Sequence, residues 1–291
     1  MALDFKRAKK PARRLRKLLK TMDAKPTPGQ VHDFRTNSRN LEATLQAFGL
    51  ENSGVGRHIL KPISRLRKRA GKIRDMDVLT SYATSVEAQD GERDCAVELL
   101  EHLGAKRRKY GRKFHSAVRE AGSKLRLHLK QVKRELGRKE ANIKDKRIVP
   151  SEPSSAALKL SSELASIPRL GHSNLHPFRL KVKELRNVLR LADTADQDLL
   201  AALVLVKDTI GEWHDWEELV KIAEKVLNHG SQCTLVSQLK STTREKFDSA
   251  LAHAEQLRKR YFGVSGKKKP SSSRPTAPAD AVVRAAMKLV V

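Results

Sequence analysis

One pattern, a histidine followed by evenly spaced cations, occurs twice in this chain of 291 residues. The positions that carry it are His32, Arg35 and Arg39, and then His176, Arg179 and Lys183. An α-helix advances about 100° per residue, so a histidine and the cations three and seven residues later share one narrow face. Apolar residues recur with the same spacing in both copies, at Phe34, Leu41 and Leu45 and at Phe178, Leu185 and Leu189. The pattern predicts two related helices, each with cations along the flank of its buried face.

A second pair of similar stretches extends this repeat. Residues 67–75 align with residues 207–215, and in both a glycine precedes an aspartate by four positions. Two motifs repeated in the same order indicate a duplication. We therefore predict two packed helical halves, whose cationic stripes would line one groove if the halves face each other.

Helical periodicity extends through nearly the whole chain, and no strand-like alternation of useful length interrupts it. Thr27 and Pro28 predict the start of a helix, as N-cap and first helical residue. A separate segment is expected to start at Asp75 or Asp77. The expected helices cover residues 3–22, 28–48, 56–72, about 75–88, 93–136 with bends or breaks at its glycines, 156–166, 174–192, 198–229 and 232–262.

The charged and then Pro- and Ser-rich stretch 137–155 predicts a linker between two halves, about 1–140 and about 156–262. Both halves form a single domain, residues 1–262, in this interpretation. Residues 263–291 are predicted to be a basic, largely disordered tail, in which 281–291 can form a weak helix.

The charge of the chain limits its partners. Its 60 lysines and arginines exceed its 33 acidic residues and give a formal charge of +27, which attracts nucleic acid, acidic membranes or phosphate polymers. Aromatic residues make up only 4% of the chain, which disfavours binding by base stacking. No apolar run approaches the ~20 residues of a membrane span, and the N-terminus lacks the apolar core of a signal peptide. We expect a cytoplasmic protein without a membrane partner. Its two cysteines, Cys95 and Cys233, are expected to be reduced, and its oligomeric state stays open.

The two cationic stripes are unequal. The second continues through Arg186 and Arg190, whereas the first has Glu42 and Gln46 at the same offsets. Cations on the flank of a core are held by their packed stems. This position favours a binding site over an ordinary solvated helix face, and it points to the second copy first. The basic run 106–113 is interpreted as mainly solvated.

The sequence predicts no metal site and no enzyme. His172 and His176 have the spacing of a metal pair, but Ser173 is expected to be an N-cap that leaves His172 outside the helix, and no further ligand completes a site. Asp75 and Asp215 are interpreted as helix caps or as partners of nearby cations. Nucleophile elbow, P-loop, zinc-protease and dinucleotide motifs are absent from the sequence. We expect neither catalysis nor a cofactor.

With these motifs in view, the chain resembles the CHAD family, the conserved histidine α-helical domain. The resemblance covers roughly residues 5–262 and rests on the duplicated His-x-x-Arg-x-x-x-Arg/Lys, on Gly-x-x-Arg-Asp-x-Asp-Val at 71–78 and on Gly-Glu-Trp-His-Asp at 211–215. It implies an all-α fold of two pseudo-symmetric helical bundles around a basic central groove or pore, and binding of inorganic polyphosphate, with association with polyphosphate granules. A nucleic-acid-binding protein is the alternative. The polyphosphate-binding residues expected from the stripes and the resemblance are His32, Arg35, Arg39, Arg67, His176, Arg179, Lys183, Arg186, Arg190 and Lys207.

Overall fold

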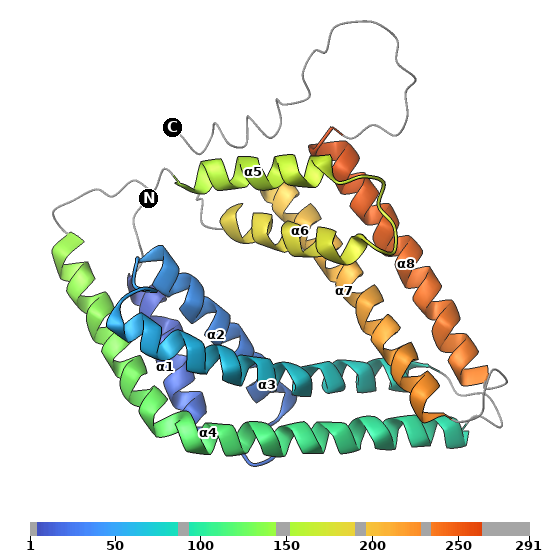
Figure 1. Cartoon of the computed structure of the whole chain (residues 1–291), viewed down its shortest axis with the longest axis horizontal. Coiled ribbons are helices and arrows are strands. Elements are labelled where there is room, and N and C mark those ends of the chain that lie inside the picture. Colours follow the sequence, from blue (N-terminus) through green and yellow to red (C-terminus); the bar gives the residue numbers. More distant parts are fainter. Residues whose placement is uncertain (1–4, 87–92, 144–151, 190–195, 228–233, 264–291) are drawn as a thin grey trace, which may run out of the picture. The chain divides into compact units, whose positions relative to one another are not determined.

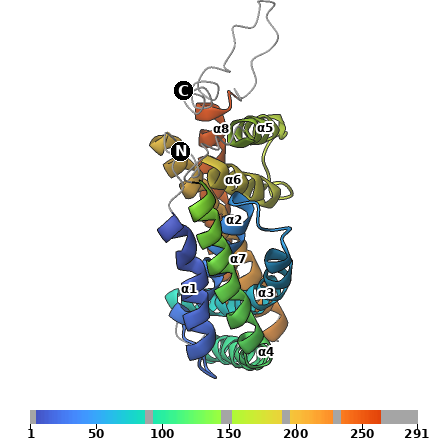
Figure 2. The same ribbon diagram turned by 90° about the vertical axis from the view of Figure 1, so that its left-hand side faces the viewer.

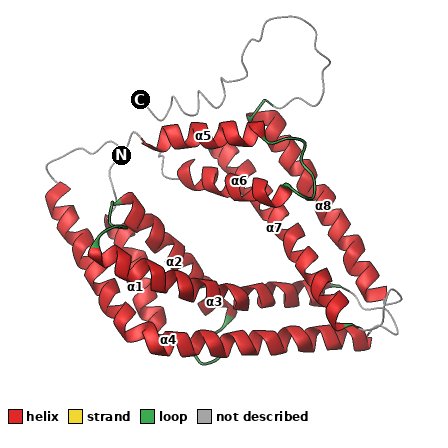
Figure 3. Ribbon diagram, viewed as in Figure 1, coloured by secondary structure: helices red, strands yellow, loops and turns green. Residues whose placement is uncertain are grey.

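In the computed structural model, every regular element of the described residues is a helix (Figures 1 and 3). The structure describes residues 5–86, 93–143, 152–189, 196–227 and 234–263. The helices in these ranges are α1 (Phe5–Thr21), α2 (Pro28–Ala47), α3 (Gly54–Ser85), α4 (Arg93–Ile143), α5 (Glu152–Ser166), α6 (Leu175–Leu189), α7 (Gln197–Val226) and α8 (Thr234–Tyr261). The predicted all-α fold is confirmed for this part of the chain. None of its helices is long and apolar enough to cross a membrane.

The chain divides into two compact units. Ala2–Arg147 contains α1 to α4, and Ile148–Val291, grouped with Met1, contains α5 to α8. In the first unit α1 lies alongside α4 in both views and also packs on α2, while α3 packs between α2 and α4 (Figures 1 and 2). Leu15, Phe34 and Phe114 are fully buried in its core.

The second unit has its own core. Here α6 packs between α5 and α7, and α7 packs on α8. Phe178 of α6, Trp213 of α7 and Leu257 of α8 meet in this core, each with at most 2% of its surface exposed. Each unit therefore buries its own apolar faces, one set for each copy of the repeat.

The predicted start of α2 is confirmed. Thr27 Oγ1 accepts a hydrogen bond from Gln30 N at 3.1 Å, and Gln30 Oε1 accepts one from Thr27 N at 2.9 Å. This capping box satisfies two backbone groups that a helix start leaves unpaired. Because it fixes Pro28 as the first helical residue, it places His32 in the second turn of α2.

The predicted break before Asp75 or Asp77 is wrong, because α3 runs unbroken from Gly54 to Ser85. Ile73, Met76 and Leu79 are buried and continue the apolar stripe of the preceding turns, so the helix gains by continuing. Neither aspartate caps a helix there.

The predicted start of the linker at residue 137 is also wrong. α4 extends through Ile143 and is bent but continuous despite its glycines (Figure 1). Lys139 Nζ donates to Phe48 O at 2.6 Å, and the side chains of Lys9 and Glu140 form an ion pair, so this part of α4 is tied to α1 and to the end of α2. α5 already begins at Glu152. The remaining predicted linker residues, 144–151, lie outside the described residues, as do Cys233 and the predicted tail from residue 264.

Candidate polyanion-binding site

The first copy of the repeated motif lies on α2, and its cations lie at the edge of a buried face. The apolar residues of this helix are buried, whereas His32 and Arg39 are exposed and Arg35 is half-buried. His32 Nε2 lies 3.4 Å from Thr36 Oγ1 on the next turn. The side chains thus stand beside the core, as their helical spacing predicts.

Arg35 joins α2 to α3. Its Nη1 donates to Gly71 O at 3.3 Å and lies 3.6 Å from Asp75 Oδ1. A Cβ atom on Gly71 would lie 3.9 Å from the same nitrogen, an ordinary contact. Asp75 is therefore a partner of a cation, one of the two roles predicted for it.

Arg67 of α3 is neutralised within the first unit. Its Nη1 lies 2.5 Å from Glu42 Oε2 of α2, and one fifth of the arginine side chain is exposed. Glu42 occupies the position on α2 that Arg186 occupies on α6. Because a carboxylate at contact distance offsets most of the attraction for a second anion, Arg67 is less available to a ligand than the sequence suggests.

The second copy lies on α6, where Arg179 reaches across to α7. Arg179 Nε donates to Lys207 O at 3.0 Å. A Cβ atom on Gly211 would lie only 2.7 Å from Arg179 Nη2, so the glycine leaves the space that the guanidinium occupies. Among the described residues Arg179 has no carboxylate partner. Its two Nη groups keep their donors for a ligand.

Both units therefore seat the arginine of the first motif against the glycine of the second. The carbonyl that accepts from the arginine belongs to Gly71 in the first unit and to Lys207 in the second. Lys207 aligns with Arg67, so the two accepting carbonyls lie about one helical turn apart in the aligned motifs. The charge balance differs as well, because Asp75 lies beside the first arginine only. The second unit thus offers the less compensated guanidinium.

His176 faces a second histidine that the sequence reasoning did not select. Its ring centroid lies 4.8 Å from that of His214 on α7, and its buried Nδ1 has no hydrogen-bond partner among the described residues. Burial, and then the positive charges of His214 and Arg179, lower the pKa of His176. Attraction to the Asp215 carboxylate, 3.8 Å from Nδ1, raises the pKa of His214. The second unit therefore pairs an imidazole that loses its proton more readily with one that holds its proton more readily. Either ring can donate to an anion.

The other expected residues of the second unit fall on the same two helices. Lys183 and Arg186 are half-buried on α6. The ammonium group of Lys207 contacts the Asp208 carboxylate next to it. Arg190 lies outside the described residues. His214 was missed because its alignment partner in the first half is an arginine, and only the packing of α6 on α7 shows that it meets His176.

His172 takes part in a different contact. Its Nε2 lies 2.6 Å from Glu217 Oε1, and its ring packs edge-on against Trp213 at 5.1 Å. The helix begins after it at Leu175, so His172 lies outside α6 as predicted, although Asn174 rather than Ser173 immediately precedes the helix. No group of three or more metal-ligating side chains occurs among the described residues.

The basic run on α4 is mainly exposed, as predicted, although Arg107 and Tyr110 make contacts with other elements. Arg107 Nε lies 2.5 Å from Asp77 Oδ1, and its Nη2 donates to Pro26 O at 2.9 Å. Lys72 of α3 lies over the ring of Tyr110. This part of the run thus links α4 to α3 and to the connection between α1 and α2, while Lys109 and Lys113 are exposed as expected.

The fold and these cations define an all-helical, strongly basic protein in which a repeated histidine–arginine motif is seated against a repeated glycine. The sequence model of the CHAD domain matches residues 9–224, which is most of the chain. The chain belongs to the CHAD family.

A solved structure has a similar fold. PptA from Streptomyces chartreusis aligns with 87% of this chain and 97% of its own, at 14% sequence identity and a TM-score of 0.58. At this identity the likeness shows the fold alone. Comparison with curated proteins gave no significant match.

Proposed function

We propose that this chain binds inorganic polyphosphate and does not catalyse a reaction on it. The observation that carries the proposal is Arg179, whose guanidinium is fixed by Lys207 O and by the space at Gly211, and whose remaining donors have no carboxylate partner in the described residues. Membership of the CHAD family supports the choice of ligand. The proposed contacts come from His32, Arg35, Arg39, Arg67, His176, Arg179, Lys183, Arg186, Arg190 and Lys207.

The chemistry of these side chains suits a linear phosphate polymer. Arginine offers forked donors that match pairs of phosphate oxygens, and lysine offers a mobile point charge. A fixed guanidinium loses less conformational freedom on binding than a mobile one does. The net charge of +27 adds long-range attraction for the approaching polyanion.

The proposal has finer parts that rest on the sequence repeat, on the composition of the chain and on the family resemblance. These are an internal duplication that gives two pseudo-symmetric bundles, a basic groove or pore that receives the ligand, and a cytoplasmic location with association with polyphosphate granules. The absence of catalysis belongs to the proposal too. Release of phosphate from polyphosphate in the presence of Mg²⁺ would contradict it.

Competition between two polyanions tests the proposed ligand. At about 0.2 M salt, where weak diffuse attraction is largely lost, long-chain polyphosphate is expected to displace labelled duplex DNA of equal total charge from the protein. The reverse displacement is expected to fail. Equal competition by the two polymers would favour a general basic protein, and preference for DNA would favour the nucleic-acid alternative.

A glycine-to-alanine substitution tests the seat of Arg179. Gly211→Ala places a methyl group where the guanidinium now lies, so Arg179 has to move. We expect roughly tenfold weaker binding of polyphosphate, the cost of about one charge-assisted hydrogen bond. The free energy of unfolding should not fall, because alanine favours a helix over glycine by about 1 kcal/mol. Calorimetric titration and urea unfolding measure the two quantities.

Gly71→Ala is the matched control for this variant. The added methyl group there meets Arg35 at an ordinary distance, 3.9 Å, so Arg35 keeps its place. The affinity of this variant for polyphosphate should stay within about twofold of that of the original protein. The corresponding change in binding free energy is well below the ~1.4 kcal/mol of a tenfold loss. Equal weakening by both substitutions would show that the position of Arg179 is not what matters.

A further inference from the structure

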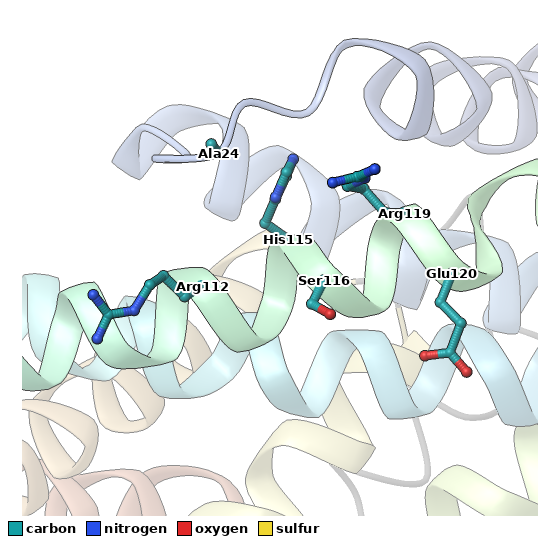
Figure 4. Close-up of a pocket in the computed structure, with 6 residues that line it drawn as sticks. All are labelled: Ala24, Arg112, His115, Ser116, Arg119 and Glu120. Carbon is teal, nitrogen blue, oxygen red and sulfur yellow. The ribbon is translucent and has the colours of Figure 1, made fainter.

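A separate group of polar side chains lies on α4, away from the repeated motifs. Together with Ala24 of the connection between α1 and α2, it forms a pocket of about 450 Å³ (Figure 4). This volume is within the ~300–1,000 Å³ range of small-molecule sites. The residues of α4 that line the pocket are Arg112, His115, Ser116, Arg119 and Glu120.

The cationic residues of this pocket lie along one side of α4, but only His115 and Arg119 point the same way (Figure 4). His115 and Arg119 follow Arg112 by three and seven residues, and this spacing places all three residues on one face of α4. In Figure 4, His115 and Arg119 point toward the chain at Ala24, whereas Glu120 points the opposite way. The only acidic residue of the lining thus turns its carboxylate away from the two cationic side chains.

Hydrogen bonds to α4 hold both ends of the segment that covers the pocket. On one side Arg107 Nη2 donates to Pro26 O at 2.9 Å, and on the other Arg126 Nη1 donates to Leu19 O at 3.4 Å. The α1–α2 connection is therefore fixed over α4 before any ligand arrives.

The cations between these two anchors have no protein partner. Among the described residues, the side chains of Arg112, His115 and Arg119 make no hydrogen bond and no ion pair. Arg107 and Arg126, in contrast, use their donors on backbone carbonyls. The pocket thus presents the unused donors of the His115 imidazole and the Arg119 guanidinium, while the exposed Arg112 side chain extends away from them along α4 (Figure 4).

We propose that this pocket binds a diphosphate group, as a second anion site independent of the polyphosphate function. Arginines seven residues apart on a helix are separated by about 10 Å along its axis. One end of two linked phosphoryl groups can meet Arg119 and His115, and the other end can meet Arg112 once its exposed side chain turns toward the pocket. A single small anion is too short to meet all three. His115 lies between the two arginines and supplies a further donor. The diphosphate can be free pyrophosphate or part of a nucleotide such as ADP.

The test follows the His115 side chain by NMR in the full-length protein, with His115→Gln to assign its signals. Pyrophosphate and ADP are titrated separately at about 0.1 M salt, to limit diffuse binding. We expect saturable shifts of the His115 signals with at least one of them. Saturation by ADP alone would identify a nucleotide diphosphate, and saturation by pyrophosphate would identify the inorganic group. Absence of a saturable shift with both compounds would overturn the proposal.

Two double variants complete the test. Arg112→Ala with Arg119→Ala is expected to weaken binding at this pocket at least tenfold, since two charge-assisted contacts are lost. Arg13→Ala with Arg134→Ala removes the same charge from exposed positions outside the pocket and should leave the affinity unchanged. Equal weakening by both pairs would overturn the proposal in favour of diffuse attraction. Arg179→Ala should leave the shifts of the His115 signals unchanged, because Arg179 does not line this pocket. A failure of the polyphosphate proposal is therefore distinguishable from a failure of the diphosphate proposal.

Discussion

Arg258→Ala is expected to lower the free energy of unfolding of the second unit by about 3 kcal/mol, because it removes charge-assisted hydrogen bonds from a buried position. The Arg258 side chain is 3% exposed, and its two Nη groups donate to Pro168 O at 3.3 Å and to Ile167 O at 2.5 Å. These carbonyls follow the last residues of α5, where a helix end leaves acceptors unpaired. The substitution leaves both carbonyls without their donor and leaves a cavity beside Leu257.

The measurement can be restricted to the second unit. Both tryptophans of the chain, Trp213 and Trp216, are buried on α7, so the change of tryptophan fluorescence in urea reports this unit. Arg260→Ala is the control on the same helix, since its pair with Asp198 is exposed on both sides and exposed pairs contribute about 0–1 kcal/mol. Destabilisation of equal size in the two variants would show that the buried hydrogen bonds of Arg258 are not essential.

Local sequence patterns predicted those parts of the structure that depend on one helix at a time. Thr27 and Pro28 mark the start of α2 because capping involves only adjacent residues. The periodicity around Phe34 and Phe178 predicted the buried faces of α2 and α6, since a period near 3.6 is visible in the sequence itself. The same helical periodicity predicted that the cations lie along the flank of each buried face.

The features that were missed depend on the docking of one helix against another. Arg67 meets Glu42 only when α3 packs on α2, and the pairing of His176 with His214 needs α6 on α7. The continuity of α3 was missed for a different reason. An aspartate is a common N-cap residue, but the buried residues around Asp75 stabilise an unbroken helix more than a new cap would. Tertiary packing thus overrides a local signal.

The glycines of the second motif show what the structure adds to the repeat. In the sequence, Gly71 and Gly211 are only positions that coincide when the halves are aligned. In the structure, each lies under the arginine of the first motif. A Cβ atom would lie 3.9 Å from the Arg35 guanidinium at Gly71 and 2.7 Å from the Arg179 guanidinium at Gly211. The guanidinium therefore requires a glycine at position 211, whereas an alanine would fit beside Arg35 at position 71.

Arg35→Ala combined with Arg179→Ala is expected to weaken polyphosphate binding by about 100-fold at ~0.1 M salt, through the loss of two direct phosphate contacts. The helices should remain folded. The carbonyls that these arginines contact belong to the helical segments of α3 and α7, and alanine favours a helix. The exposed carboxylate of Asp75 loses a partner at little cost, because water solvates it.

The salt dependence of binding separates direct contacts from diffuse attraction. For a flexible polyanion, each phosphate contact contributes about 0.7 to the slope of log K against log salt concentration, so the double variant should lower that slope by about 1.4. Arg13→Ala with Arg134→Ala removes the same formal charge from exposed positions and should leave the slope nearly unchanged. If both pairs lower affinity and slope equally, the repeated motif does not hold the ligand, and the net charge of +27 accounts for the binding on its own.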